Sequence, residues 1–216
     1  MLCNDFQCVF VHIPKVAGES IESFFYTLLG VTREMLLLRS NKDPKLGPEQ
    51  LSHLTAEEYV RFGHLTPEQF KSYYKFSFVR NPWKRLASEY IFKRYIDKFE
   101  FKDFVLNHFP KPDDYSDASR HVLPQYDFLY DSQGNRLVDF VGRFENLQAD
   151  FNIVCQKLGI EDSQLPHLNS NKQNKIKKGY KQEYKPYLEY YDDETKEFVG
   201  KIYQKDIETF GYRFTD

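Results

Sequence analysis

The segment VHIPKVAGES, residues 11–20, decides the fold of this chain, because it predicts a strand, a tight turn and a helix in direct succession. The apolar residues before Pro14 are typical of a buried strand, and Pro14 ends that strand because it has no amide proton to donate. From Ser20 onward, apolar residues recur with the period of an amphipathic helix that ends at Gly30. The turn at 15–19 allows consecutive amides to point at one anion, in front of the positive end of the helix. The segment therefore predicts an anion site.

A second segment, FSFVRNPWKRLASEY at residues 76–90, also predicts a strand that runs into a helix, with Asn81 as the N-cap. Arg80 stands at the carboxyl end of this strand. Ligands gather at the carboxyl ends of strands in open α/β sheets, so Arg80 and Lys15 would meet in one crevice if the two strands are neighbours. Ser88, further along the helix, could add a hydroxyl. A second anion site is therefore predicted here.

Several classes of protein are disfavoured by the same sequence. The pattern GxxxxGK[ST] of nucleotide triphosphatases does not occur, because Lys15 precedes the small residues of the turn instead of following them. A net charge of −2 argues against general binding of nucleic acid. A length of 216 residues with 41% hydrophobic residues suits one core, so we expect one domain over residues 1–216.

Together the two segments resemble the cofactor motifs of sulfotransferases that use 3′-phosphoadenosine 5′-phosphosulfate (PAPS), in particular the carbohydrate branch that includes heparan sulfate 2-O-sulfotransferase. Residues 11–20 resemble the loop for the 5′-phosphosulfate. Residues 78–90 resemble the 3′-phosphate motif, including the spacing from Arg80 to Ser88. Weaker similarity continues through RHVLPQ, GRFENL and DIETFGYRF, at residues 120–125, 142–147 and 206–214. The resemblance implies an α/β fold with a P-loop-type central parallel sheet flanked by helices, in a single sulfotransferase domain.

This resemblance implies that PAPS is the cosubstrate, that no metal is needed, and that Lys15 stabilises the transferring group and the leaving oxygen. The residues implied to bind the cofactor are Lys15, Val16, Ala17, Gly18, Glu19, Ser20, Arg80 and Ser88, with Lys177 and Lys178 in a basic loop that closes over the nucleotide. The family usually has a hydroxyl residue where this chain has Val16 and Glu19. We therefore expect the amides and Ser20 to bind the donor, with two alternatives: Glu19 faces the acceptor as a base, or the cofactor site is degenerate.

The reaction also needs a base for the acceptor hydroxyl, and histidine suits that role near neutral pH. We predict His64, in FGHLTPEQF, because the resembling enzymes have a catalytic histidine in a similar GH context. His12, beside the Lys15 turn, and His121, beside Arg120, are the alternatives. The remaining histidines have no such signal: His53, His108 and His167.

Cysteine and histidine spacing predicts no metal centre, because neither CxxC nor HxxxH occurs. Three cysteines and no secretory leader suggest free thiols in a reducing compartment. No stretch approaches the roughly 20 consecutive apolar residues that span a bilayer, so we expect a cytoplasmic protein without a membrane segment. The acceptor is expected to be a carbohydrate or another hydroxyl compound, and the oligomeric state is open. The alternative functions are a P-loop kinase and a catalytically silent protein that binds nucleotide or glycan.

Three further elements are predicted from local pattern. A helix is expected at 147–158, closed by Gly159. A hairpin is expected to join 128–130 to 138–141, and a last helix is expected at about 194–210.

Overall fold

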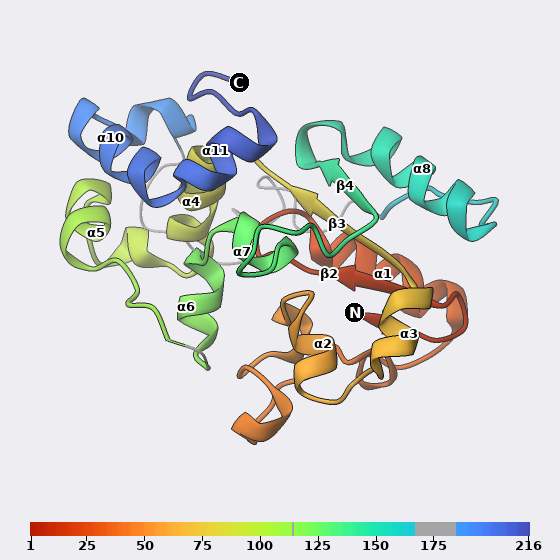
Figure 1. The fold of residues 1–216 in the computed structure, drawn as a ribbon. Coiled ribbons are helices and arrows are strands. Elements are labelled where there is room, and N and C mark those ends of the chain that lie inside the picture. The colour runs from red at the N-terminus through yellow and green to blue at the C-terminus, as the bar shows by residue number, and fades with distance from the viewer. Residues whose placement is uncertain (114, 167–184) are drawn as a thin grey trace. The chain divides into compact units, whose positions relative to one another are not determined.

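The computed structural model describes residues 1–113, 115–166 and 185–216, and its chain divides into two compact units (Figure 1). Unit 1 consists of Met1–Arg80 and Pro112–Pro166, and unit 2 of Asn81–Lys111 and His167–Asp216. One sulfotransferase domain over residues 1–216 stays a prediction. Among the described residues, no helix combines the length and hydrophobicity that crossing a bilayer requires.

A mostly parallel sheet lies in unit 1. Its strands, in spatial order, are β1 (Leu2–Cys3), β2 (Cys8–Val11), β3 (Tyr74–Val79) and β4 (Phe140–Arg143). The short β1 runs antiparallel to β2, whereas β2, β3 and β4 are parallel to one another. Because β2 and β3 are neighbours, their carboxyl ends meet at one edge of the sheet, as expected. The predicted α/β class, with a central sheet flanked by helices, is confirmed.

The helices of unit 1 begin with a long one that follows β2. They are α1 (Gly18–Leu29), α2 (Glu58–Arg61), α3 (Pro67–Ser72), α6 (Asp117–Val122), α7 (Gln125–Leu129) and α8 (Leu147–Leu158), with 3₁₀ turns η1 (Arg33–Leu36), η2 (Pro44–Leu46), η3 (Leu51–His53) and η5 (Phe144–Asn146). The predicted α1 is confirmed, although it starts two residues before Ser20, and α8 has the predicted bounds. Each of these two helices ends at a glycine in the left-handed conformation.

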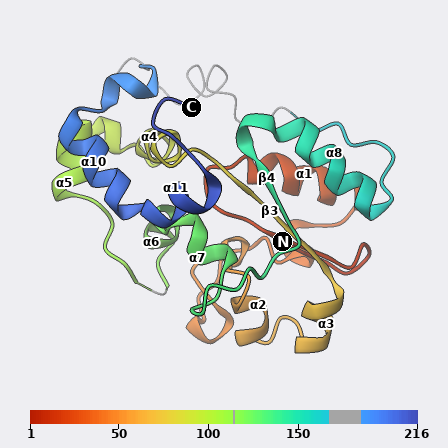
Figure 2. The same cartoon turned by 45° about the horizontal axis from the view of Figure 1, so that its top comes forward.

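Helices α1 and α8 lie side by side, as Figure 2 shows, and aromatic rings join them to the sheet. Phe24 of α1 meets Phe151 of α8 edge to face, with ring centroids 5.0 Å apart. Phe25 of α1 lies 6.2 Å from Phe76 of β3, which stacks on Phe10 of β2 at 5.2 Å. All five rings are largely or fully buried. This aromatic layer holds α1, and with it the turn that precedes α1, against the end of β2.

Unit 2 is helical in its described residues, and its elements are α4 (Pro82–Phe92), η4 (Tyr95–Asp97), α5 (Phe101–Asn107), η6 (Tyr187–Tyr190), α10 (Asp193–Ile202) and α11 (Gln204–Phe210). The predicted N-cap is confirmed, since the Asn81 side chain accepts hydrogen bonds from the amides of Trp83 and Lys84. Arg85 is buried in this unit, with its guanidinium over the ring of Tyr203.

Two of the predicted elements are wrong. Residues 128–130 and 138–141 do not form a hairpin: α7 includes 128 and 129, one isolated bridge joins Tyr130 to Arg136, and β4 pairs instead with β3. Strand β4 is the last strand in the sheet order, and its parallel partner β3 comes from residues more than 60 positions earlier, which a local turn pattern cannot indicate. The last helix is also two helices, α10 and α11, which meet at the buried Tyr203.

Candidate active site

The connection between β2 and α1 has the backbone geometry of an anion-binding loop. Lys15 and Ala17 both adopt left-handed conformations, with φ of 72° and 70°, while Val16 between them does not. Such alternation turns successive amides toward a common point. Among the described residues, no main-chain carbonyl accepts a hydrogen bond from the amide of Ala17 or Gly18. The two amides lie at the amino end of α1, a helix of 12 residues. The helix dipole favours an anion at this end.

The imidazole of His12 lies directly behind this loop. An ideal Cβ placed on Gly18 would lie 1.9 Å from Nε2 of His12, so only glycine allows the ring to approach this closely. On its other side the ring meets α1, where Nδ1 lies 2.5 Å from a carboxylate oxygen of Glu22. Burial alone would raise the pKa of Glu22, but the charges of His12 and of Arg33, with the hydrogen bond from His12, lower it. Residue His12 thus ties the end of β2 to the second turn of α1.

Arg80 follows β3 and contacts the loop directly. Its Nη1 atom donates a hydrogen bond of 3.1 Å to the carbonyl of Lys15, and its guanidinium lies 4.1 Å from the ring centroid of Phe144. The side chain of the buried Gln125 holds the main chain of Arg80 from both sides. Gln125 Oε1 accepts from the Arg80 amide at 2.8 Å, and Gln125 Nε2 donates to the Arg80 carbonyl at 2.8 Å. The structure therefore brings Lys15 and Arg80 together, as the sequence predicts.

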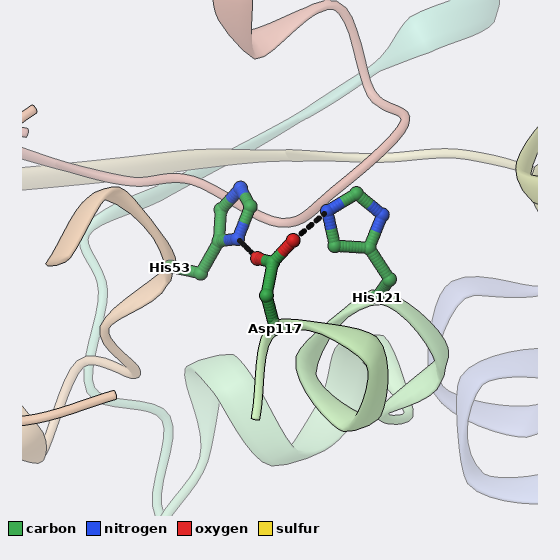
Figure 3. Close-up of side chains that lie close together, drawn as sticks. All are labelled: His53, Asp117 and His121. Carbon is green, nitrogen blue, oxygen red and sulfur yellow. Dashed lines mark hydrogen bonds and ion pairs between the residues drawn. The ribbon is translucent and has the colours of Figure 1, made fainter. Parts of the chain in front are cut away.

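Further imidazoles lie next to His12. The ring of His53 meets that of His12 edge to face at 5.0 Å, and the ring of His121 meets that of His53 at 5.0 Å. Asp117 lies between the last two: its Oδ1 is 2.9 Å from Nδ1 of His53, and its Oδ2 is 3.5 Å from Nε2 of His121 (Figure 3). We call His53, Asp117 and His121 the histidine cluster. Burial lowers the pKa of His53 to about 3, although its hydrogen bond with Asp117 acts to raise it.

A buried ion pair fixes the helix that carries half of this cluster. Arg120 of α6 donates two hydrogen bonds to Glu58, at 2.9 and 2.7 Å, and both side chains are less than a tenth exposed. Glu58 Oε2 also accepts from the amide of Thr55 at 2.9 Å. Removing one member would leave an uncompensated buried charge, so the pair holds α6 strongly in register with the segment after His53.

Comparison with known proteins agrees with this geometry, because residues 1–213 match the sulfotransferase family. The chain belongs to the sulfotransferase family. An uncharacterized protein of Archaeoglobus fulgidus is 31% identical to this chain over 111 residues, which are 47% of this chain and 80% of that protein. No solved structure matches.

The residues of the loop between β2 and α1 differ in exposure. Lys15 is half-buried, Val16 and Ser20 are buried, and Glu19 is exposed in the first turn of α1. The amide of Ser20 donates to the carbonyl of Ala17, as befits the first turn of the helix.

The other predicted site residues do not contact the loop in the described contacts, belong to unit 2, or lie outside the described residues. His64 is in the connection between α2 and α3, with its Nε2 atom 2.7 Å from the carbonyl of Leu46. Helix α3 leads into the amino end of β3, opposite to the end that precedes Arg80. Ser88 is half-buried on α4 in unit 2. Lys177 and Lys178 lie outside the described residues.

Sequence reasoning missed three residues that the structure places at the site. Neither His53 nor Asp117 stands in a recognisable motif, because a lone DxxxH spacing is not specific for any site. Gln125 belongs to the RHVLPQ segment, whose similarity to the family is weak. That segment was the available signal, since it also contains His121.

We predict opposite effects of substitution at adjacent loop positions. Gly18→Ala should lower the free energy of unfolding by about 1–3 kcal/mol, because the new methyl group would overlap the buried ring of His12. Ala17→Gly should leave stability unchanged or raise it by up to about 1 kcal/mol, since it relieves a left-handed alanine. Urea unfolding of the two variants measures the difference. Equal stability of Gly18→Ala and the wild type would contradict the close approach of His12.

A second prediction concerns Gln125. Gln125→Leu removes both hydrogen bonds to the main chain of Arg80 and should destabilise the protein by about 1–3 kcal/mol per group left unsatisfied. The matched control is Gln133→Leu on an exposed turn, which should change stability by less than about 0.5 kcal/mol. Thermal unfolding of both variants tests the assignment, and similar midpoints for the two would show that Gln125 does not hold Arg80.

Proposed function

We propose that this protein transfers the sulfuryl group of PAPS to a hydroxyl of a carbohydrate acceptor. The observation that carries the proposal is the loop at the start of α1, in which Lys15 and Ala17 have left-handed conformations and Arg80 donates a hydrogen bond to the Lys15 carbonyl. Membership of the sulfotransferase family supports sulfuryl transfer in general. The identity of the donor and the class of acceptor rest on the motif resemblance.

The described residues fit the charge of this donor. When bound, PAPS supplies a sulfuryl group already activated by a phosphate leaving group. The amides of Ala17 and Gly18 and the positive end of α1 would bind its 5′-phosphosulfate, and the Lys15 ammonium would stabilise the charge that develops on the leaving oxygen. Arg80 and Ser88 are proposed for the 3′-phosphate, and Lys177 and Lys178 for a basic segment beside the nucleotide, both by resemblance.

The base is proposed from two histidines. His64 stays a prediction, but the described contacts favour His53. Asp117 holds Nδ1 of His53, which keeps that proton in place and leaves Nε2 as the acceptor atom. Burial lowers the pKa of His53, so its imidazole is neutral at pH 7 but a weak base, and the negative charge of Asp117 would stabilise the imidazolium as it takes the acceptor proton. His53 also reaches the loop through the ring of His12, whereas the ring of His64 contacts the carbonyl of Leu46.

A cavity lined by the Glu58–Arg120 pair could receive the acceptor. It has a volume of about 200 Å³, and Glu58 and Arg120 form part of its wall together with Thr55, Arg61, Asp113 and Ser119. Arg120 directly precedes His121 on α6. Because the walls offer both hydrogen-bond donors and acceptors, a neutral compound rich in hydroxyls suits them better than a strongly charged one.

Transfer of labelled sulfate from PAPS to a panel of neutral and acidic glycans tests the proposed function. Lys15→Ala should lower the rate by about 10²–10³-fold, because the charge on the leaving oxygen loses its main cation. Lys157→Ala, at an exposed lysine near the end of α8, is the control and should keep the wild-type rate. Binding of adenosine 3′,5′-bisphosphate without transfer would favour the silent binding protein, and phosphate transfer from ATP would favour the kinase.

The choice of base is tested by a direct comparison. His53→Asn should lower kcat by about 10²–10⁴-fold with little change in donor affinity, while His64→Asn should change kcat much less. Donor affinity is measured by calorimetry with adenosine 3′,5′-bisphosphate, which also reports whether each variant is folded. A large loss in His64→Asn with a small one in His53→Asn would restore His64 as the base.

A further inference from the structure

The histidine cluster combines the ligand types of a transition-metal site. One potential ligand atom from each of His53, Asp117 and His121 lies within 4.8 Å of the others. In Figure 3 the carboxylate of Asp117 lies between the two imidazole rings, with one oxygen toward each ring. The three side chains are 10%, 18% and 6% exposed. Two imidazoles with one carboxylate are typical ligands of Zn²⁺ and of related divalent ions.

The spacing of the donor atoms suits an ion of this kind. In a tetrahedral site with bonds of ~2.0–2.1 Å, the ligand atoms lie roughly 3.3 Å apart. Nδ1 of His53 lies 2.9 Å from Oδ1 of Asp117, and Nε2 of His121 lies 3.5 Å from Oδ2, so each nitrogen is near this distance from one of the two carboxylate oxygens. An ion could therefore enter with small movements of the side chains.

The backbone holds the three ligands in place before any ion binds. Asp117 and His121 are four residues apart on α6 and therefore share one face of the helix. Helix α6 is fixed by the buried pair of Arg120 with Glu58, and His53 ends the 3₁₀ turn η3. A site that is already assembled loses little conformational freedom when an ion binds.

We propose that His53, Asp117 and His121 bind a divalent transition-metal ion of the zinc type, with a fourth position open to water. The ion replaces the proton that Nδ1 of His53 shares with Asp117, and the neutral imidazole then has its proton on Nε2. Nothing is oxidised or reduced. The next step rests on the proposed function, in which Nε2 of His53 takes the proton of the acceptor hydroxyl. With the ion on Nδ1, Nε2 already has a proton and no free lone pair, so zinc inhibits transfer.

Calorimetry with Zn²⁺ alone, on the full chain after treatment with a chelator, tests the proposal without any turnover. We expect stoichiometric binding to the wild type and an affinity lower by about tenfold or more in His53→Asn and in His121→Asn. The matched control is His108→Asn, because Nε2 of His108 also lies near a carboxylate, that of Asp103 at 3.3 Å, but on an exposed surface. His108→Asn should bind zinc as the wild type does. Equal affinities of His121→Asn and the wild type, or no binding to the wild type, overturn the proposal.

Two further measurements separate the site from the fold and from the activity. Thermal unfolding without metal shows whether each variant is folded, and Co²⁺ in place of Zn²⁺ should give visible absorption bands in the wild type that His53→Asn lacks. In the transfer assay, zinc should inhibit the wild type reversibly, and half-inhibition of His121→Asn should need about tenfold more zinc relative to its own rate without zinc. Metal binding without any transfer would reject the proposed function and keep the site. Sulfate transfer by a protein that binds no metal would reject the metal site and keep the proposed function.

Discussion

The contact of His12 with Gly18 is the constraint on which the site depends. The ring of His12 packs against the backbone of Gly18, the first residue of α1, and contacts Glu22 one turn later. These two contacts allow the helix to start at only one distance from β2. The residues between must bridge that distance, and they do so with Lys15 and Ala17 in left-handed conformations that non-glycine residues adopt at a cost of about 1–2 kcal/mol each. Strain of this kind persists only where surrounding contacts determine it, and it is found at functional sites.

The second strand supports the same loop from the side. Ser77 of β3 donates its hydroxyl to the carbonyl of Val11 at 2.6 Å, where β2 ends, and Arg80 reaches the carbonyl of Lys15. Arg80 is held in turn by Gln125 and by the ring of Phe144, which follow much later in the chain. Because its main chain and its guanidinium are both fixed, the cation at the carboxyl edge of the sheet is preorganised for an anion.

Buried polar groups concentrate at this edge of unit 1. Glu22, Glu58, Arg120, His12, His53 and His121 are all less than a tenth exposed, and each has a charged or hydrogen-bonding partner. Taking such groups out of water costs free energy that an apolar core would not, so their presence points to chemistry and not to stability. The close spacing of imidazoles around Asp117 suits a general base, and the same spacing suits a metal ion. An ion on Nδ1 of His53 would leave the imidazole proton on Nε2, which is the atom that a base needs without a proton.

The local elements could be predicted from the sequence because they depend on residues close together in the chain. The turn after β2, the helix closed by Gly159 and the Asn81 cap follow from periodicity, a missing amide proton and a capping side chain, all of which act within a few residues. Lys15 meets Arg80 only because β2 and β3 pair in parallel. The sequence did not show that these two strands are neighbours, so the meeting could be predicted only on the condition that they are.

Contacts between distant residues were decided by the tertiary structure alone. His53 and Asp117 are 64 positions apart in the sequence, and no periodic pattern links the two residues. The same is true of Gln125, whose amide meets Arg80 across 45 positions. The sequence determined the strand, turn and helix that make an anion site, because local backbone preferences are sufficient for that. Only packing of the core decided which histidine, carboxylate and amide side chains surround it, because burial selects partners by position in space and not by distance along the chain.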